Sequence, residues 1–313
     1  MSVEVSVVIP TFRRLDVLPE VLDALERQVD APSFEIVVVD DGSADGTAAY
    51  LNRRRFRVPV RILQQSNQGP AAARNHGVEV AEGTWVAFLG DDTVPSPGWL
   101  AAHRRAHRER GDGEELAVIG YTGWHRRVPL TPFLKYINEY GLQFGYALIE
   151  DSDSVPFNFF YTSNLSLHRS RLLAEPFDTR FPYPAYEDIE CGYRLMEKRG
   201  GRLLYRADAI TAHDHPTTID RFMKRQEKAG YCGVVFALLH PELSGWVGVG
   251  SDGPPPIPEA PRQRRLETLA RVLQNLPVPA PRLWETVLRY HYIRGLHRGW
   301  HERARRQPKG DSP

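Results

Sequence analysis

The stretch FEIVVVDDGS, residues 34–43, decides the fold of this protein. Its first half is an almost unbroken apolar run rich in β-branched residues, and it changes at once to two aspartates, a glycine and a serine. A strand that is apolar on both faces is typical of a parallel sheet covered by helices on each side. We therefore expect a buried strand that ends in an acidic turn.

The segments around this stretch alternate between strand and helix patterns. Residues 5–10 form a short β-branched run, and residues 15–28 place apolar side chains on one helical face. The order predicts an α/β fold with a doubly wound, mostly parallel, Rossmann-like sheet, in which ligands bind beyond the carboxyl ends of the strands. The other predicted segments are helices at residues 44–54 and 69–83 and strands at residues 58–65 and 85–90.

The pattern becomes mixed after about residue 115, which predicts three parts. Residues 1–115 form the α/β half, and residues 116–250 form a mixed, aromatic-rich half of the same domain. Residues 251–313 begin as a proline-rich linker and continue as a basic, aromatic helical tail. Within the mixed half we expect a strand at residues 116–124, a strand at 162–168, a helix at 186–200 and a strand pair at 201–214.

Composition limits the classes of function. The chain has 313 residues, 42% of them hydrophobic, so it can bury a full core. Its net charge is only +1, so it has no overall positive electrostatic field that would attract nucleic acid. The N-terminus lacks the pattern of a signal peptide and no long apolar run follows, which predicts a cytoplasmic protein. Cys191 and Cys232 show no metal-binding spacing and are expected to be buried thiols.

Two adjacent carboxylates, Asp91 and Asp92, follow the predicted strand at residues 85–90. The turn after the first strand reads PTFRR, without the glycine pattern of a dinucleotide site, and no Walker loop is present. Nicotinamide chemistry is therefore disfavoured, and a bound diphosphate would need another source of positive charge. A divalent metal held by carboxylates supplies it. The alternative is a pair of exposed acids that cap the turn before Pro95.

Four motifs together resemble the family 2 glycosyltransferases of GT-A fold. They are VSVVIPTFRR, FEIVVVDDGSADGT, NQGPAAARNHGVEVAEGTWVAFLGDD and YEDIECGYRL, within residues 4–225. The resemblance implies transfer of a sugar, with inversion, from a nucleotide diphosphate sugar (UDP-, GDP- or dTDP-) to a saccharide, lipid-linked or other hydroxyl acceptor. It also implies Mn²⁺ or Mg²⁺ as cofactor, and a role in polysaccharide, cell-envelope or glycoconjugate synthesis.

Carried over to this sequence, the resemblance implies a nucleoside site at the first two strand ends. Pro10, Thr11 and Phe12 would lie against the nucleoside, with Arg14 at the same end, and Asp41 would accept hydrogen bonds from the base. A carboxylate can read adjacent N–H donors of uracil or guanine. The alternative for the acidic pair at residues 40–41 is an Asx turn or helix cap.

The metal and phosphate positions follow in the same way. The family's DxD motif reads Gly90, Asp91, Asp92 here, so its first acid is missing. The resemblance implies that Asp92 binds the metal directly and that Asp91 contacts ribose or bound water. Arg74, near the start of a helix, would approach the diphosphate. The alternative for Arg74 is a solvated helix arginine.

The second acidic pair supplies the candidate base. The resemblance assigns Asp188 to take the proton of the acceptor hydroxyl, and Glu187 to orient the acceptor or the helix start. Acids that favour a helix N-terminus are the alternative. In ADAITAHDHPTT the resemblance implies that His213, which matches better than His215, is a further metal ligand, and a structural histidine is the alternative.

Two other functions stay open at this point, and so does the place where the C-terminal tail lies. A retaining transferase on the same fold would make Asp188 an acceptor-binding group, and a catalytically silent sugar-nucleotide-binding protein is suggested by the missing first acid. The tail repeats apolar residues among many cations, so it could lie on an anionic membrane surface or dock as an ordinary helix. Its apolar residues are Trp284, Leu288, Tyr292, Leu296 and Trp300.

Overall fold

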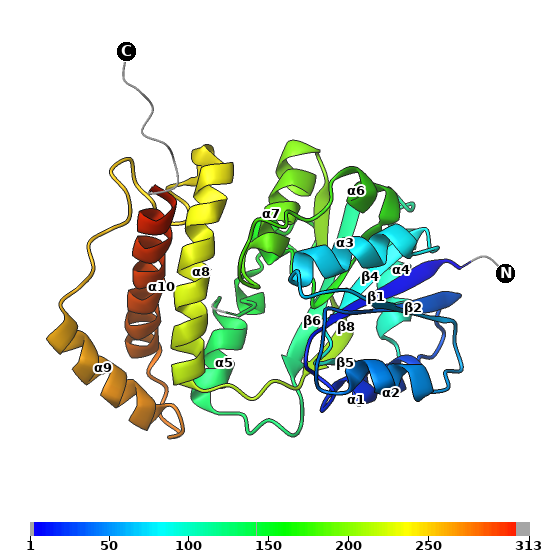
Figure 1. The fold of residues 1–313 in the computed structure, drawn as a ribbon, viewed down its shortest axis with the longest axis horizontal. Coiled ribbons are helices and arrows are strands. Elements are labelled where there is room, and N and C mark those ends of the chain that lie inside the picture. The colour runs from blue at the N-terminus through cyan, green and yellow to red at the C-terminus, as the bar shows by residue number, and fades with distance from the viewer. Residues whose placement is uncertain (1–2, 142, 305–313) are drawn as a thin grey trace, which may run out of the picture. The chain divides into compact units, whose positions relative to one another are not determined.

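A computed structural model describes residues 3–141 and 143–304 of the chain (Figure 1). Within it the chain divides into two compact units. The first holds the whole sheet, and the second holds the C-terminal helices. The first unit consists of residues 1–129, 137–179 and 187–216, and the second of residues 130–136, 180–186 and 217–313.

The N-terminal half of the sheet is parallel, as the sequence predicts. Four strands lie in the order β3-β2-β1-β4, and every neighbouring pair among them is parallel. The central position of β1 and β2 explains why both are apolar on both faces. The strands are β1 Val5–Thr11, β2 Phe34–Asp40, β3 Val60–Gln64 and β4 Trp85–Leu89, and the helices between them are α1 Leu18–Leu25, α2 Thr47–Arg53 and α3 Pro70–Val80.

Alternation along the strands divides the core between the two faces of the sheet. Val7 and Ile9 of β1 belong to the cluster that contains the apolar side chains of α1, whereas Val8 belongs to the cluster with α3. Successive side chains of a strand point to opposite faces of the sheet, so a single strand contributes side chains to both clusters. Figure 1 shows α1 and α3 on opposite sides of these strands.

The rest of the sheet is mixed, in the order β4-β7-β6-β8-β5. β7 is antiparallel to β4 and to β6, β8 is parallel to β6, and β5 is antiparallel to β8. The new elements are β5 Thr93–Pro95, α4 Trp99–Glu109, β6 Leu116–Trp124, α5 Pro132–Glu139, β7 Asn164–His168, α6 Arg169–Ala174, α7 Glu187–Tyr193 with a π-helical turn at Arg194–Lys198, and β8 Arg202–His213.

The predicted strand pair at residues 201–214 is wrong, because β8 is one continuous strand. It pairs with β6 on both sides of a register shift between Gly120 and Tyr121. Opposite that shift, Ala207 and Asp208 are exposed. A bulge of this kind interrupts the apolar pattern without ending the strand. The polar residues at the bulge therefore look in the sequence like a turn between two strands.

Two buried histidines of α4 form a polar network with residues of β7 inside the first unit. His103 contacts the Ser166 hydroxyl through Nδ1 and the Asn164 side-chain oxygen through Nε2, both at 2.8 Å. His107 Nε2 lies 2.9 Å from the same hydroxyl. Burial lowers the pKa of His103 to about 4 and that of His107 to about 3. Both imidazoles are therefore neutral in the folded protein at neutral pH.

This network predicts acid-sensitive stability. An unfolded histidine has a pKa of about 6.5, so below that pH the unfolded chain binds protons that the folded chain excludes. The free energy of unfolding should fall as pH drops from about 6.5 towards 4, by up to about 1.4 kcal/mol per pH unit for each histidine. Urea unfolding at several pH values should show a shallower slope for His107→Phe. The exposed His301→Asn is the control, and an unchanged slope in His107→Phe would contradict the assignment.

The second unit contains three longer helices, α8 Ile219–Leu239, α9 Ala260–Leu273 and α10 Pro281–Ala304. The tail is therefore two helices, and α9 begins inside the predicted linker. Trp284, Leu288 and Leu296 of α10 are buried. These three side chains form core, as expected for the alternative of an ordinary docking helix, and membrane contact through the rest of the tail stays a prediction. No helix in the described residues is both long enough and apolar enough to cross a bilayer.

Glycines let α8 and α10 pack closely, and Figure 1 shows the two helices side by side. A Cβ on Gly230 would collide with the Tyr292 carbonyl oxygen, and one on Gly295 would collide with the Glu227 carbonyl oxygen. Both obstacles are backbone atoms, which cannot rotate away.

We predict that Gly230→Ala destabilises the protein. Forcing extra volume into a packed contact typically costs about 1–3 kcal/mol. Thermal or urea unfolding measures the loss. Gly245→Ala is the matched control in the same unit, because its added Cβ would have nothing within 4 Å. Equal stabilities of the two variants would contradict the close packing of α8 and α10.

Candidate active site

Asp92 lies just after β4 and faces two histidines at the end of β8. Its Oδ1 is 3.3 Å from His213 Nε2, and its Oδ2 is 3.3 Å from His215 Nδ1. The ligand atoms of the three side chains all lie within 4.8 Å of one another. We call Asp92, His213 and His215 the Asp-His-His cluster.

The donor atoms of this cluster fit a divalent transition metal. One carboxylate and two imidazoles suit Mn²⁺ better than an all-oxygen ion such as Ca²⁺. Asp92 and His213 are the two ligands named from the sequence, while His215 was set aside. The spacing of His213 and His215 could have found it, because alternate residues of an extended chain point to the same side.

The side chains around His213 hold it in place. The Gln143 side-chain amide lies 2.9 Å from His213 Nδ1, and both residues are buried. The Trp124 ring stacks on the imidazole, with the centroids 5.6 Å apart and the planes at 22°. A partner on one ring nitrogen fixes the orientation of the other, which faces Asp92.

Cationic and imidazole groups stabilise the charge on Asp92. Arg14 Nη2 lies 3.1 Å from Asp92 Oδ2 and 2.7 Å from His215 Nδ1. Burial alone would raise the pKa of Asp92, but His213 and then Arg14 outweigh it and hold this pKa well below its usual range. Asp92 is therefore an anion over the whole neutral range.

Asp91 has a different environment from Asp92. Its Oδ2 accepts a hydrogen bond of 3.3 Å from the Phe12 backbone N–H, which ties the loop to the end of β1. Burial raises the pKa of Asp91 to about 7, and the adjacent Asp92 charge adds to the rise. Asp91 lies outside the Asp-His-His cluster, and its expected contact with ribose or bound water stays a prediction.

Gly90 is explained by its close neighbours. A Cβ there would lie 2.5 Å from the Thr93 hydroxyl and 3.3 Å from Asp92 Oδ1. An acid at position 90 would therefore push against the side chains that follow it. Gly90 therefore lets the Thr93 and Asp92 side chains keep the positions that they have in this turn.

The residues expected to contact the nucleoside lie at the ends of β1 and β2. Phe12 is 39% exposed, whereas Thr11 is buried. The Arg13 guanidinium lies 4.9 Å from the centroid of the Phe12 ring. Pro10 is half-buried. Of the three residues named for the nucleoside, Phe12 offers the most open surface for a base to stack on.

The Asp41 carboxylate holds the loop that leads into α3. It accepts hydrogen bonds from the backbone N–H groups of Gln68 and Gly69, both at 2.8 Å, and from the Gln65 side chain at 2.9 Å. The neighbouring Asp40 accepts from the Ser43 N–H at 2.9 Å, which is the Asx turn considered above. A carboxylate offers about four acceptor positions, so Asp41 keeps limited capacity for a base.

The second acidic pair lies at the start of α7. Arg74 Nη1 is 3.0 Å from Glu187 Oε1, and both side chains are nearly buried. Arg74 is thus neither a solvated arginine nor an unpaired cation. Burial raises the pKa of the neighbouring Asp188 to about 7, the charge on Glu187 adds to the rise, and Arg74 opposes it. A half-buried carboxyl with a pKa near 7 suits a general base.

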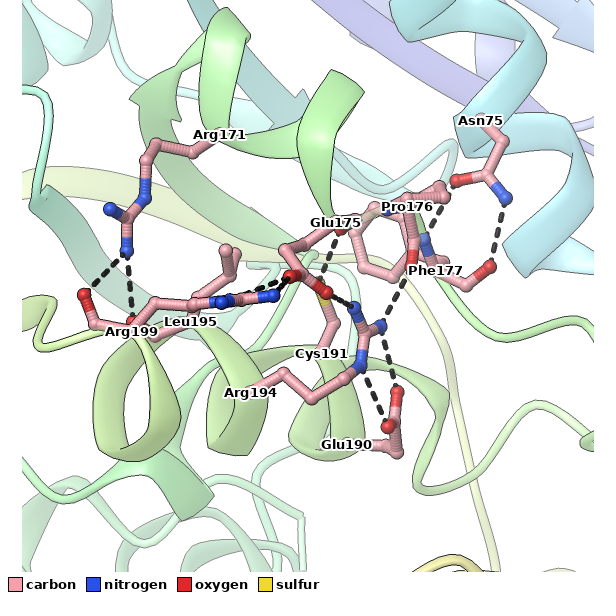
Figure 2. A network of polar contacts seen from close by, with 10 residues as sticks. All are labelled: Asn75, Arg171, Glu175, Pro176, Phe177, Glu190, Cys191, Arg194, Leu195 and Arg199. Carbon is pink, nitrogen blue, oxygen red and sulfur yellow. Dashed lines mark hydrogen bonds and ion pairs between the residues drawn. The ribbon is translucent and has the colours of Figure 1, made fainter.

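A network of polar contacts fixes α7 (Figure 2). Arg194 binds Glu190 on its own helical segment, at 2.8 Å, and Glu175 at 3.0 Å, and it donates to the Pro176 carbonyl oxygen at 2.7 Å. Asn75 of α3 exchanges two hydrogen bonds of 2.9 Å with the Phe177 backbone. These contacts join α7 to the 175–177 segment and that segment to α3, which carries Arg74. Sequence reasoning missed this network because its members are ordinary surface residue types.

The fold is that of the GT-A glycosyltransferases. The structure matches a mannosyltransferase from Pyrobaculum calidifontis, solved with GDP-Man and Mn²⁺, with a TM-score of 0.61 and 18% identity over 96% of this chain and 88% of that one. It also matches S. aureus TarS 1–349, solved with UDP, with a TM-score of 0.51 and 16% identity over 98% and 93% of the two chains.

The sequence comparisons point to glycosyltransferases as well. Residues 6–153 match the model of glycosyl transferase family 2, so this segment is similar in sequence to a domain of that family. A validoxylamine A glucosyltransferase of Streptomyces hygroscopicus subsp. limoneus is 30% identical over 215 residues, which cover 61% of this chain and 47% of the relative. The hyaluronan synthase of Pasteurella multocida is 25% identical over 246 residues, 68% of this chain and 25% of the relative. The chain thus spans half or less of these relatives.

Proposed function

We propose that this protein is a metal-dependent, inverting glycosyltransferase that moves a sugar from a nucleotide diphosphate sugar to an acceptor hydroxyl. The observation that carries the proposal is the Asp-His-His cluster beside β4 and β8, in a family 2 domain. Mn²⁺ or Mg²⁺ held there would neutralise the charge that develops on the leaving diphosphate. Structural neighbours were solved with UDP and with GDP-Man and Mn²⁺, which supports a UDP- or GDP-sugar as donor, and a dTDP-sugar is the third donor class of the proposal.

The chain's own residues supply the other roles. Phe12 stacks on the base, Asp41 accepts from its edge, and Asp91 contacts ribose. Asp188 takes the proton of the acceptor hydroxyl as that oxygen bonds to the anomeric carbon and the bond to the diphosphate breaks. Glu187, paired with Arg74, keeps a negative charge beside Asp188 and so favours its role as base.

The three-part division of the chain belongs to the same proposal. Residues 1–115 take the nucleotide sugar, residues 116–250 take the acceptor, and residues 251–313 are an extension outside the chemistry. The acceptor belongs to polysaccharide, cell-envelope or glycoconjugate synthesis.

A thermal-shift screen followed by product analysis tests the function. UDP-, GDP- and dTDP-sugars are added with and without Mn²⁺, because a ligand that binds only the folded protein raises its melting temperature. We expect one nucleotide class to stabilise the protein only with Mn²⁺. NMR of the transfer product should show an inverted anomeric centre, and a retained one would reject Asp188 as the base of a single displacement.

The second candidate function is a silent sugar-nucleotide-binding protein. Gly90 in place of the first motif acid, and Arg14 against Asp92, favour it. A nucleotide that binds, with neither transfer nor hydrolysis in the presence of Mn²⁺, would select this function over catalysis.

A further inference from the structure

One nitrogen of Arg14 bridges two ligand atoms of the Asp-His-His cluster. Nη2 is 2.7 Å from His215 Nδ1 and 3.1 Å from Asp92 Oδ2, and these two atoms are 3.3 Å apart. A guanidinium NH₂ group has two hydrogens, so it can donate to both atoms at once. Arg14 therefore reaches the same pair of atoms that a bound cation would use.

The hydrogen bond to His215 and a metal bond at the same nitrogen exclude each other. A neutral imidazole nitrogen that accepts a hydrogen bond has a single lone pair. His215 Nδ1 can give that pair to the Arg14 N–H or to a metal ion. Asp92 Oδ2 has a second lone pair, but the positive guanidinium beside it repels a divalent cation.

We propose that Arg14 competes with the divalent cation for His215 and Asp92, and that the nucleotide diphosphate relieves this competition. The proposal rests on the metal site of the proposed function. Arg14 makes the site a poor binder of metal alone. A diphosphate offers the displaced guanidinium new anionic acceptors, which arginine binds well.

The position of Arg14 in the chain is compatible with such an exchange. Its side chain is 30% exposed, in contrast to the more deeply buried Asp92 at 13%. It follows Arg13, whose backbone has a φ of +56°, at the irregular end of β1. Arg14 can therefore change partners without moving a strand.

The competition predicts an increase in metal affinity when a positive side chain is removed. In Arg14→Met, without nucleotide, Mn²⁺ should bind about tenfold more tightly or better, since a hydrogen bond to a charged group no longer has to be broken. The signal of free Mn²⁺ in electron paramagnetic resonance gives the dissociation constant directly. Arg13→Met is the matched control, because it removes a neighbouring charge that lies over Phe12 instead of the cluster. It should change the Mn²⁺ affinity by less than about twofold, as expected for an exposed charge.

The same titration with UDP or GDP measures the coupling. Whichever nucleotide binds should raise the Mn²⁺ affinity of the wild type by a larger factor than that of Arg14→Met. Only the wild type has the competing guanidinium that the diphosphate draws away, and this relief appears as coupling between the two binding free energies. Weaker or unchanged Mn²⁺ binding in Arg14→Met would overturn the proposal, as would an equal nucleotide effect in the two proteins.

Failure of the metal site itself looks different. If the wild type and Arg14→Met both bind no Mn²⁺, or if His213→Ala and His215→Ala bind it as well as the wild type, the metal site of the proposed function is wrong. If those histidine variants lose Mn²⁺ and Arg14→Met does not gain it, only the role of Arg14 is wrong.

Discussion

Asp188→Asn should abolish sugar transfer while leaving the affinity for the nucleotide nearly unchanged. The amide keeps the shape of the side chain but cannot take a proton, and a positioned general base typically contributes about 10²- to 10⁴-fold to the rate. We expect kcat to fall within or beyond this range. Isothermal titration of the nucleotide with Mn²⁺ should give a dissociation constant within about threefold of the wild type, because the proposed donor contacts lie on other segments.

The pH dependence gives this prediction a second readout. Burial and Glu187 raise the pKa of Asp188 to about 7. A base acts in its unprotonated form, so kcat/KM at saturating Mn²⁺ should rise about tenfold per pH unit below pH 7 and level off above it.

Removing the charge of Glu187 should shift the pH range over which kcat/KM rises. Glu187→Gln removes one cause of the raised pKa of Asp188. The rise of kcat/KM with pH should therefore occur at lower pH in this variant. Glu190→Gln is the control on the same helix, since Glu190 is paired with Arg194. An Asp188→Asn enzyme that retains its turnover would reject Asp188 as the base.

Asp92→Asn should lose metal binding, which is the second large effect. Asp92 is the carboxylate of the Asp-His-His cluster. Loss of a residue that merely supports a metal ligand costs about 10- to 100-fold in affinity, so loss of the charged ligand itself should exceed that range. Titration of Mn²⁺ by electron paramagnetic resonance measures it, and the metal-dependent stabilisation by the nucleotide should disappear as well.

The neighbouring acid provides the control for this variant. Asp91 lies on the same loop but points to the Phe12 backbone N–H. Asp91→Asn should therefore keep Mn²⁺ affinity within a few-fold of the wild type, as expected for a residue outside the ligand set. Equal losses in the two variants would contradict the separation of metal and donor roles along this loop.

Much of the fold could be predicted because its causes are local. The apolar runs of β1, β2 and β4 and the amphipathic helices between them repeat over short distances, and the parallel half of the sheet follows from their order. The bulge in β8 was misread because polar residues at a bulge and at a turn give the same short-range pattern.

The candidate site was predictable wherever a motif names a residue type. Asp92, His213 and Asp188 come from short motifs. Gly90 stood out as a departure from one of them, and a Cβ there would lie 2.5 Å from the Thr93 hydroxyl.

By itself, the sequence therefore determined the parallel sheet, the acids that follow its strands and the similarity of residues 6–153 to glycosyl transferase family 2. Only the tertiary structure decided which partners those acids meet. Arg14 and His215 are 201 residues apart in the chain, and Arg74 and Glu187 are 113 apart. Pairs so distant meet only because the order of the strands brings their ends together, and neither periodicity nor composition carries that information. The same holds for α10, whose apolar residues could face a membrane or a core until α8 packs against them.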